Sequence, residues 1–121
     1  MKVHNNNRAI GNEGETKAIE YLQSKGYKIL KKNFCFGKVG EIDIIAEEGN
    51  SLVFIEVKYW KSRLYGDPLE AITTKKQNSL RKVAEAYLYI NHIYNRECRF
   101  DVICIDIINE RLEIRHFVNA F

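Results

Sequence analysis

Residues 40–58 read GEIDIIAEEGNSLVFIEVK, two β-prone stretches that meet at the dipeptide Gly49-Asn50. This dipeptide favours a two-residue hairpin turn, so residues on the two strands pair by counting outward from it. The expected pairs are Glu48 with Ser51, Ala46 with Val53, Ile44 with Ile55, Asp43 with Glu56, and Glu41 with Lys58. The stretch therefore predicts a β-hairpin whose register is set by its turn.

Side chains alternate between the two faces of a strand, which divides this hairpin into an apolar face and a charged face. The apolar face would bury against a helix or a second layer, and it comprises Ile42, Ile44, Ala46, Val53, Ile55 and Val57. The charged face comprises Glu41, Asp43, Glu56 and Lys58. The hairpin is thus expected to contribute both to the core and to a candidate site.

The charged face suits metal-assisted chemistry on a phosphodiester. Opposed residues on antiparallel strands have Cβ atoms roughly 4.5–5.5 Å apart, so Asp43 facing Glu56 would cost stability unless a cation lay between them. Mg²⁺ takes oxygen ligands and keeps waters, so two carboxylates, a backbone carbonyl and solvent would make a site. Lys58 could reach the scissile phosphate or an attacking water. The alternative is a solvated, charge-balanced strand end, because a Glu-x-Lys pattern is common.

Size and composition indicate one globular domain. The chain has 121 residues, of which 45% are hydrophobic and 29% are charged, and its net charge is +3. No apolar run approaches membrane-spanning length. Residues 1–12 are polar and Asn-rich and lack the apolar core of a signal peptide, so we expect a flexible arm, a single domain over residues 13–121, and a cytoplasmic location.

The cysteines and histidines suggest no chemistry of their own. Cys35, Cys98 and Cys104 are odd in number and widely spaced, which favours buried thiols over a disulfide framework or a zinc site. The histidines are isolated and are assigned no role.

The first helix is expected to span residues 13–25, with Asn12 as its cap and Gly26 as its stop. Its apolar stripe contains Ala18, Ile19 and Leu22, and one turn back this stripe reaches Glu15. Glu15 would then point inward. It would either form a salt bridge or a capping contact, or act as a third acid near Asp43 and Glu56.

A second helix is expected from Thr74 to Asn91, with an inner stripe of Leu80, Val83, Ala84, Tyr87 and Leu88. Gln77 lies one turn before this stripe, where it could present a polar group to the site or serve as the glutamine of a capping box that begins at Thr74. Basic residues surround it, and they would either attract phosphates or form a solvated helix surface. These residues are Lys75, Lys76, Arg81 and Lys82.

Residues 59–68 mix basic and aromatic residues before a loop signal, and Lys61 and Arg63 supply the positive charge. Such a mixture suits nucleic acid, although local packing of exposed rings explains it nearly as well. Further strands are expected over residues 27–34, 99–108 and 111–117. The resulting order α-β-β-β-α-β-β predicts a mixed sheet with helices packed on it, of α+β or α/β class.

Several of these stretches together resemble a known family. They are Gly14-Glu15, Gly40-Glu41-Ile42-Asp43, Phe54-Ile55-Glu56-Val57-Lys58, Arg99-Phe100-Asp101-Val102 and Asn119-Ala120-Phe121. In this order, from about Gly11 to Phe121, the chain resembles the YraN family of uncharacterised bacterial proteins. That family looks like a member of the PD-(D/E)xK nuclease superfamily, often compared with Holliday junction resolvases, which implies a restriction-endonuclease-like core.

The resemblance implies roles for particular residues. Asp43 and Glu56 would be ligands of Mg²⁺ or Mn²⁺, with the Val57 carbonyl as a third ligand, and Lys58 would be the catalytic lysine. Glu15 matches the helix-borne acid of such cores, and Gln77 resembles a second-helix residue that some branches place near the site. Trp60 stands where the family often has an arginine, and Ile42 replaces the proline of the superfamily name.

Two functions of different class follow as expectations. The first is a metal-dependent endonuclease that hydrolyses DNA, with branched DNA among its candidate substrates, and symmetric cutting of a junction would call for a homodimer. The second is a nucleic-acid-binding protein that keeps the nuclease fold without cutting. A weaker third option is a partner-binding protein whose charged hairpin face is only surface.

Overall fold

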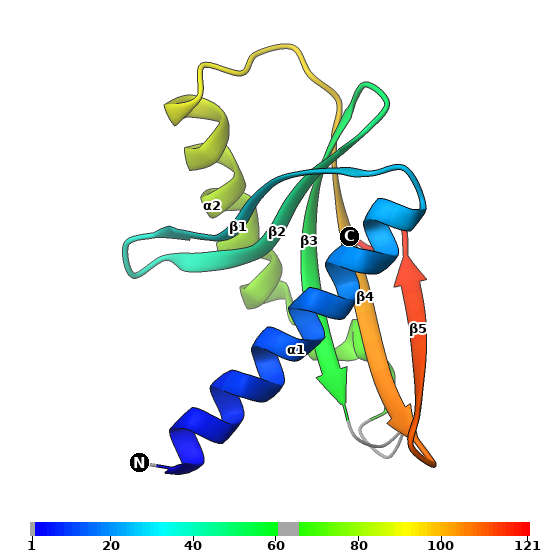
Figure 1. Ribbon diagram of the computed structural model, residues 1–121. Coiled ribbons are helices and arrows are strands. Elements are labelled where there is room, and N and C mark those ends of the chain that lie inside the picture. Colours follow the sequence, from blue (N-terminus) through cyan, green and yellow to red (C-terminus); the bar gives the residue numbers. More distant parts are fainter. Residues whose placement is uncertain (1, 61–65) are drawn as a thin grey trace.

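The computed structural model describes residues 2–60 and 66–121, and the side chains from residue 13 onward within the first range. The elements follow the predicted order α-β-β-β-α-β-β (Figure 1). They are α1 (Lys2–Ser24), β1 (Lys28–Phe36), β2 (Gly40–Glu48), β3 (Ser51–Trp60), the 3₁₀ helix η2 (Pro68–Ala71), α2 (Thr74–Ile90), β4 (Cys98–Ile108) and β5 (Arg111–Phe117).

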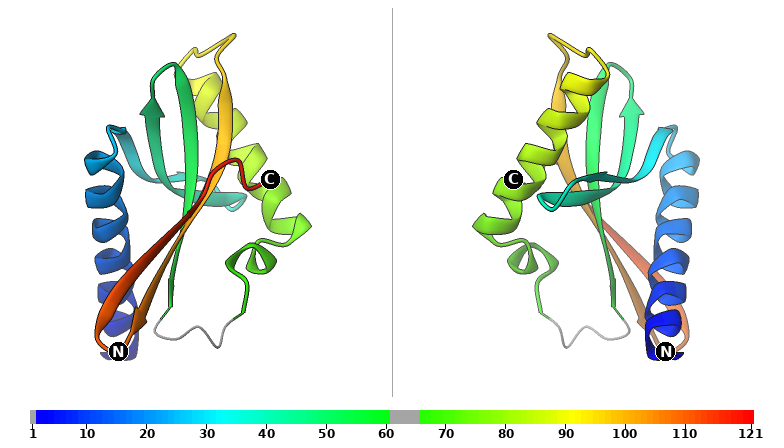
Figure 2. Two further views of the ribbon diagram at one scale, coloured as in Figure 1. Left: turned by 90° about the vertical axis from the view of Figure 1, so that its right-hand side faces the viewer. Right: turned by 90° about the vertical axis from the view of Figure 1, so that its left-hand side faces the viewer.

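The five strands form one mixed sheet in the order β1-β2-β3-β4-β5. Neighbouring strands are antiparallel except for β3 and β4, which are parallel. Parallel strands need a crossover connection, and α2 lies within it. Figure 2 shows α1 and α2 on opposite sides of the sheet. The expectation of a mixed sheet flanked by helices is therefore confirmed.

Each helix covers its own apolar cluster, so both faces of the sheet are buried. Ala18 and Leu22 of α1 pack with Ile44, Val53 and Ile55 on one face. On the other face the stripe of α2 packs against a second set of strand residues, which comprises Ile42, Ile45, Leu52, Phe54 and Val102. The second cluster accounts for the run of consecutive apolar residues in β3, which a strand buried on both faces requires.

The hairpin register is confirmed over most of its length and then ends. Glu48 pairs with Ser51, Ala46 with Val53, and Ile44 with Ile55. The ladder of β2 with β3 stops at the last of these pairs, so the predicted pairs of Asp43 with Glu56 and of Glu41 with Lys58 do not form.

The β1–β2 hairpin continues beyond this point and turns toward α2 (Figure 1). At Gly40 an added Cβ would lie 3.4 Å from a Val83 methyl group, which places the start of β2 against α2. The prediction that Ile42 shares a face with Ile44 is therefore wrong. Ile42 joins the cluster under α2 because the strand turns where its pairing with β3 ends.

The first helix is longer than predicted. It begins at Lys2 rather than near residue 13, so Asn12 lies within the helix instead of capping it, and the segment expected to be an arm is helical. Residues 2–12 contain no proline, and each residue added to an existing helix contributes a backbone hydrogen bond. The backbone hydrogen bonds gained by extending the helix therefore outweigh the weak helix propensity of the asparagines.

Gly14 allows α1 to lie directly on β3. A Cβ added at this position would overlap Cδ2 of Tyr59, because it would come closer than real Cβ atoms approach other atoms. This close approach positions the next helical residue, Glu15, over the strand that carries Glu56.

Two smaller expectations are also tested. Cys104 is buried as predicted, but Cys35 and Cys98 are exposed, because both lie at the outer ends of strands rather than in either apolar cluster. Among the described residues, no helix is both long enough and apolar enough to cross a membrane.

Candidate functional site

The candidate site lies where β2 separates from β3. Asp43, the first β2 residue beyond the ladder, turns its carboxylate toward β3, and Oδ2 accepts a hydrogen bond from the Val57 backbone N–H at 2.8 Å. The Asp43 carboxylate thus takes the place of the β2 backbone carbonyl that would accept this hydrogen bond if the ladder continued. The two strands separate beyond Ile44 and Ile55, while the hydrogen bond keeps Asp43 beside β3, the strand that carries Glu56.

Three carboxyl groups from α1, β2 and β3 influence one another at this point, and we call Glu15, Asp43 and Glu56 the acid cluster. Burial raises the pKa of Asp43 to about 8, and the charge of Glu56, a hydrogen bond between these two carboxyl groups and the charge of Glu15 add to the rise. The hydrogen bond from Val57 opposes it. Without a cation, the Asp43 carboxyl therefore keeps its proton to a higher pH than an ordinary aspartate does.

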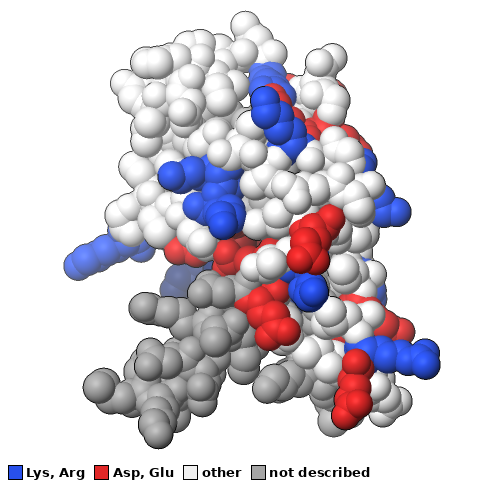
Figure 3. Space-filling model, in the orientation of Figure 1, with Lys and Arg blue, Asp and Glu red and all other residues white. Residues whose placement is uncertain are grey.

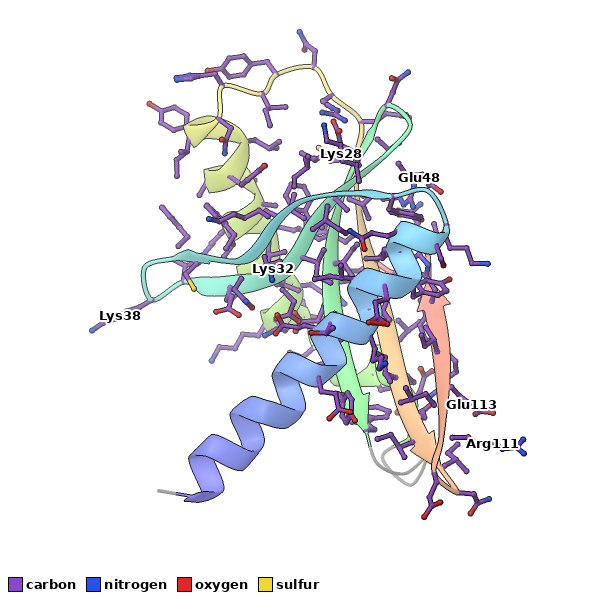
Figure 4. The ribbon with its side chains drawn as sticks, viewed as in Figure 1. Lys28, Lys32, Lys38, Glu48, Arg111 and Glu113 are labelled. Atoms are coloured by element: carbon purple, nitrogen blue, oxygen red, sulfur yellow. The ribbon has the colours of Figure 1, made fainter. Side chains whose placement is uncertain are left out.

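Glu15 takes the inward position that its helical stripe predicts. Burial raises its pKa, a hydrogen bond with Asn33 and the charge of Lys32 oppose the rise, and Glu41 and Glu56 add to it. Figure 4 shows Lys32 beside α1, whereas Lys38 extends outward from the hairpin end. The structure thus brings the helix-borne acid into the electrostatic environment of the two strand carboxylates.

Two ammonium groups flank Glu56, whose side chain is only 8% exposed. Nζ of Lys58 lies 3.7 Å from Oε2 of Glu56, and Nζ of Lys76 lies 3.3 Å from the same oxygen. Lys58 comes from the same strand, whereas Lys76 reaches across from the first turn of α2. A buried carboxylate requires such positive partners, because an isolated charge away from water is strongly unfavourable.

Gln77 has a local structural contact instead of a contact with the acid cluster. Its Nε2 donates to the Ile72 carbonyl at 3.1 Å. The helix cap is Thr73, whose Oγ1 accepts from the Lys76 backbone N–H at 3.1 Å, so the predicted capping box that begins at Thr74 is wrong by one residue. The α2 residue that meets the acid cluster is therefore Lys76, which the sequence had suggested only as a phosphate contact or as part of a solvated helix surface.

The other predicted basic residues do not converge on Glu56. Lys75 is exposed on α2, and Arg81 lies over the rings of Phe100 and Phe121, 5.3 and 5.4 Å from their centroids. Lys82 lines an apolar groove between α2 and the β1–β2 hairpin end. Lys61 and Arg63 lie outside the described residues. Figure 3 shows basic side chains above and beside an acidic patch on the face that carries α1.

The donor set at the site is oxygen only. Over residues 13–60 and 66–121, no group of three or more His, Cys, Asp and Glu side chains is arranged to hold a metal ion. A cation at this point would therefore take Asp43 and Glu56 as side-chain ligands and complete its shell with a backbone carbonyl and water, as Mg²⁺ commonly does.

A second polar cluster, which the sequence analysis missed, lies on the α1 face of β4 and β5. Asp101 is fully buried, and it accepts hydrogen bonds from Arg99 Nε at 3.0 Å and the Asn119 backbone N–H at 3.0 Å. Nε2 of His116 lies 2.7 Å from its other oxygen. Burial alone would raise the pKa of Asp101, but these hydrogen bonds outweigh burial and lower it. This cluster ties the Arg99–Asp101 stretch of β4 to His116 and to the terminal Asn119, and so it stabilises the fold.

The class of protein follows from the fold and the place of the site. A mixed five-stranded sheet flanked by two helices, with acids where the central hairpin opens, is consistent with a restriction-endonuclease-like fold. Comparison with known proteins then gives the family. The model of the uncharacterised protein family UPF0102 matches residues 14–105, and the chain belongs to this family, in agreement with the resemblance to YraN.

Relatives match along nearly the whole chain. A UPF0102 protein of Caldicellulosiruptor saccharolyticus is 48% identical over 119 residues, which cover 96% of this chain and 99% of the relative. A UPF0102 protein of Clostridium botulinum is 46% identical over 98% of both chains. One from Alkaliphilus oremlandii is 44% identical over 95% of this chain and 99% of its own.

Proposed function

We propose that the protein is a metal-dependent endonuclease that hydrolyses DNA phosphodiester bonds, with branched DNA as the first substrate to test. One observation carries the proposal: Asp43 and Glu56 converge at the opening between β2 and β3, with the ammonium groups of Lys58 and Lys76 beside them. This arrangement combines oxygen ligands for a cation with positive groups for a phosphate.

The two strand carboxylates of the acid cluster, Asp43 and Glu56, are of the donor type that Mg²⁺ or Mn²⁺ takes. Their side-chain donors are hard oxygens, and the pKa of Asp43 is raised first by burial and then by the charges of Glu56 and Glu15. A divalent cation would offset the repulsion between these charges. Asp43, Glu56 and the Val57 carbonyl would hold it, and when bound it would supply a water of lowered pKa and polarise the phosphate.

The remaining residues would bind and stabilise the phosphodiester. Lys58 would stabilise the negative charge that develops on the phosphate, because preorganised positive groups at a partly buried site are effective there. Glu15 would orient water at the acid cluster, and Gln77 would hold the first turn of α2 in place through Ile72. More distant DNA phosphates would meet the exposed basic residues Lys75, Arg81 and Lys82. Lys61 and Arg63, which lie outside the described residues, are proposed as further phosphate contacts from the sequence alone.

A cleavage assay tests this proposal. Wild type and the isosteric variants Asp43→Asn and Glu56→Gln would be incubated with labelled linear, flapped and four-way DNA in Mg²⁺ or Mn²⁺. Glu20→Gln, a change at an exposed position on α1, is the matched control. We expect cutting by wild type and the control, and its loss in both site variants. Equal cutting by highly purified Asp43→Asn would refute the assignment.

The second candidate is a nucleic-acid-binding protein that does not cut. It is favoured by the double ion pairing of Glu56, which leaves this carboxylate with positive partners without any metal. It predicts salt-dependent DNA binding with no cation uptake and no cleavage. Affinity that does not change with added salt would count against it.

The proposal for junctions includes a homodimer. Symmetric cuts in a four-way junction require two sites related by a two-fold axis. Sedimentation of the protein with and without four-way DNA would measure this directly, and a monomer in both conditions would restrict the proposed activity to single cuts.

A further inference from the structure

Glu56 receives its two ammonium partners in different ways. Lys58 is held on β3 with its side chain 25% exposed, and Lys76 extends from α2 with its side chain 43% exposed. Lys76 nevertheless lies nearer, at 3.3 Å against 3.7 Å, and both contacts are to Oε2. The more exposed lysine is therefore the closer partner of a buried carboxylate.

The backbone that carries Lys76 is fixed, but its side chain has room to move. The Thr73 hydroxyl caps the Lys76 backbone N–H at 3.1 Å, and Gln77 holds the Ile72 carbonyl at 3.1 Å. A lysine has a long flexible stem, and this one is partly in solvent, so its ammonium can leave Glu56 without a change in α2. Lys58 is less exposed and lies on the same strand as Glu56, so it has less freedom to leave.

An ammonium and a divalent cation cannot share this oxygen without cost. Both are positive, and at a site largely removed from water their repulsion is stronger than in bulk solvent. A cation that takes Glu56 as a ligand must therefore displace Lys76 or tolerate its charge nearby.

We infer that Lys76 competes with the divalent cation for Glu56 and so sets the cation affinity of the site. The inference rests on the proposed function, because it requires that the acid cluster takes up a cation. It assigns to Lys76 a contact with the acid cluster rather than only a contact with DNA.

The test compares two lysine variants by calorimetric titration of Mn²⁺ without DNA. Lys76→Met removes the ammonium beside Glu56. Lys17→Met removes a lysine of similar exposure, 39%, that pairs on α1 with the exposed Glu20. Both variants lower the net charge equally, so the difference between them reports the local contact. Thermal unfolding in the absence of metal verifies that both are folded.

We expect Lys76→Met to bind Mn²⁺ about three- to tenfold more tightly than wild type, and Lys17→Met to stay within about twofold. The increase is modest because solvent screens part of the Lys76 charge. Uptake by Lys76→Met where wild type shows none would support the inference more strongly. A purely structural ion pair would not produce tighter metal binding.

Other outcomes separate the inference from the proposed function. If wild type binds Mn²⁺ and Lys76→Met binds it equally or more weakly, the competition is refuted and the proposed function stands. If wild type and Lys76→Met both fail to bind Mn²⁺, the competition and the metal-dependent function are both contradicted.

Discussion

Asp43 accepts a hydrogen bond from the Val57 backbone N–H at 2.8 Å, at the point where β2 stops pairing with β3. This contact lets the strands separate without leaving the Val57 N–H unpaired, which would be costly at a half-buried position. It also holds the Asp43 carboxyl beside Glu56. The same hydrogen bond therefore supports the fold and assembles the acid cluster.

The raised pKa of Asp43 predicts a pH-dependent stability without metal. Its pKa is near 3.9 in the unfolded chain and about 8 in the folded protein, so the folded state binds more protons between these values. The free energy of unfolding should therefore fall as pH rises through this window. Asp43→Asn keeps an oxygen for Val57 but cannot ionise, so this contribution to the pH dependence should disappear.

Urea denaturation in EDTA measures this effect. We expect Asp43→Asn to be more stable than wild type at pH 8 by on the order of 2 kcal/mol, and the difference to shrink toward pH 5. A difference between the two proteins that does not change with pH would show that Asp43 is ionised in the folded protein.

Loss of Lys58 should reduce catalysis while preserving the fold. Removal of one positively charged or hydrogen-bonding group from a charge-stabilising site typically lowers the rate about a hundred- to thousandfold. We expect Lys58→Met to show such a loss in cleavage at saturating Mn²⁺. A rate within about twofold of wild type would exclude Lys58 from the chemistry.

Gly14 should be intolerant of a side chain. Gly14→Ala improves helix propensity by about 1 kcal/mol, but its Cβ would overlap Cδ2 of Tyr59. Such overpacking typically costs about 1–3 kcal/mol, so we expect net destabilisation in chemical denaturation. Adding Tyr59→Ala removes the obstacle, and the double variant should be more stable than the sum of the single effects predicts. Strict additivity would contradict direct contact.

Substitution of the buried Asp101 should destabilise the fold far more than substitution of Glu48, the exposed carboxylate that pairs with the same arginine, Arg99. Asp101→Asn leaves Arg99 and His116 with a weakened partner, and breaking a buried pair typically costs about 3–5 kcal/mol. Glu48 pairs with the same arginine at 2.8 Å but is 46% exposed, so Glu48→Gln should cost less than about 1 kcal/mol. Equal losses in urea denaturation would contradict this ranking.

Asp101 also predicts sensitivity to acid. Because its pKa is lowered in the folded protein, its stabilising contribution is complete above the unfolded pKa near 3.9. It is lost as pH falls through the lower folded pKa. Wild type should therefore lose stability more steeply in acid than Asp101→Asn, and parallel curves in this range would exclude the contribution.

The sequence predicted the features that local chemistry determines. The Gly49-Asn50 turn set the register as far as Ile44 and Ile55, because a tight turn leaves little choice of pairing. The stripe of Ala18 and Leu22 placed Glu15 inward, because helical spacing requires it. These relationships involve residues whose positions follow from one element alone.

The end of the β2–β3 ladder was not predicted, because it depends on packing between distant elements. The β1–β2 hairpin turns toward α2 and takes Ile42 with it, and nothing within residues 40–58 encodes that turn. Lys76 likewise meets Glu56 only because α2 crosses the sheet at this place. Strand alternation by itself would have continued the pairing through Asp43.

The Asp101 cluster could have been found from the sequence. Counting outward from the turn at Asn109-Glu110 pairs Ile103 with His116, as the structure has it. Asp101 lies two residues from Ile103 on the same face, and diagonal neighbours across a strand pair are within reach of long side chains. Counting residues outward from the turn, which pointed to Asp43 and Glu56, would therefore also have predicted the contact between Asp101 and His116.

The most direct test of the central claim is calorimetric titration of Mn²⁺ into wild type and Asp43→Asn at pH 7, in two buffers of different ionisation enthalpy. Because the pKa of Asp43 is raised to about 8, cation binding should release close to one proton from wild type. We predict Mn²⁺ binding with proton release in wild type, and much weaker binding without proton release in Asp43→Asn. Absence of Mn²⁺ binding by both wild type and Lys76→Met, or identical binding and proton release in wild type and Asp43→Asn, would contradict the proposed metal site.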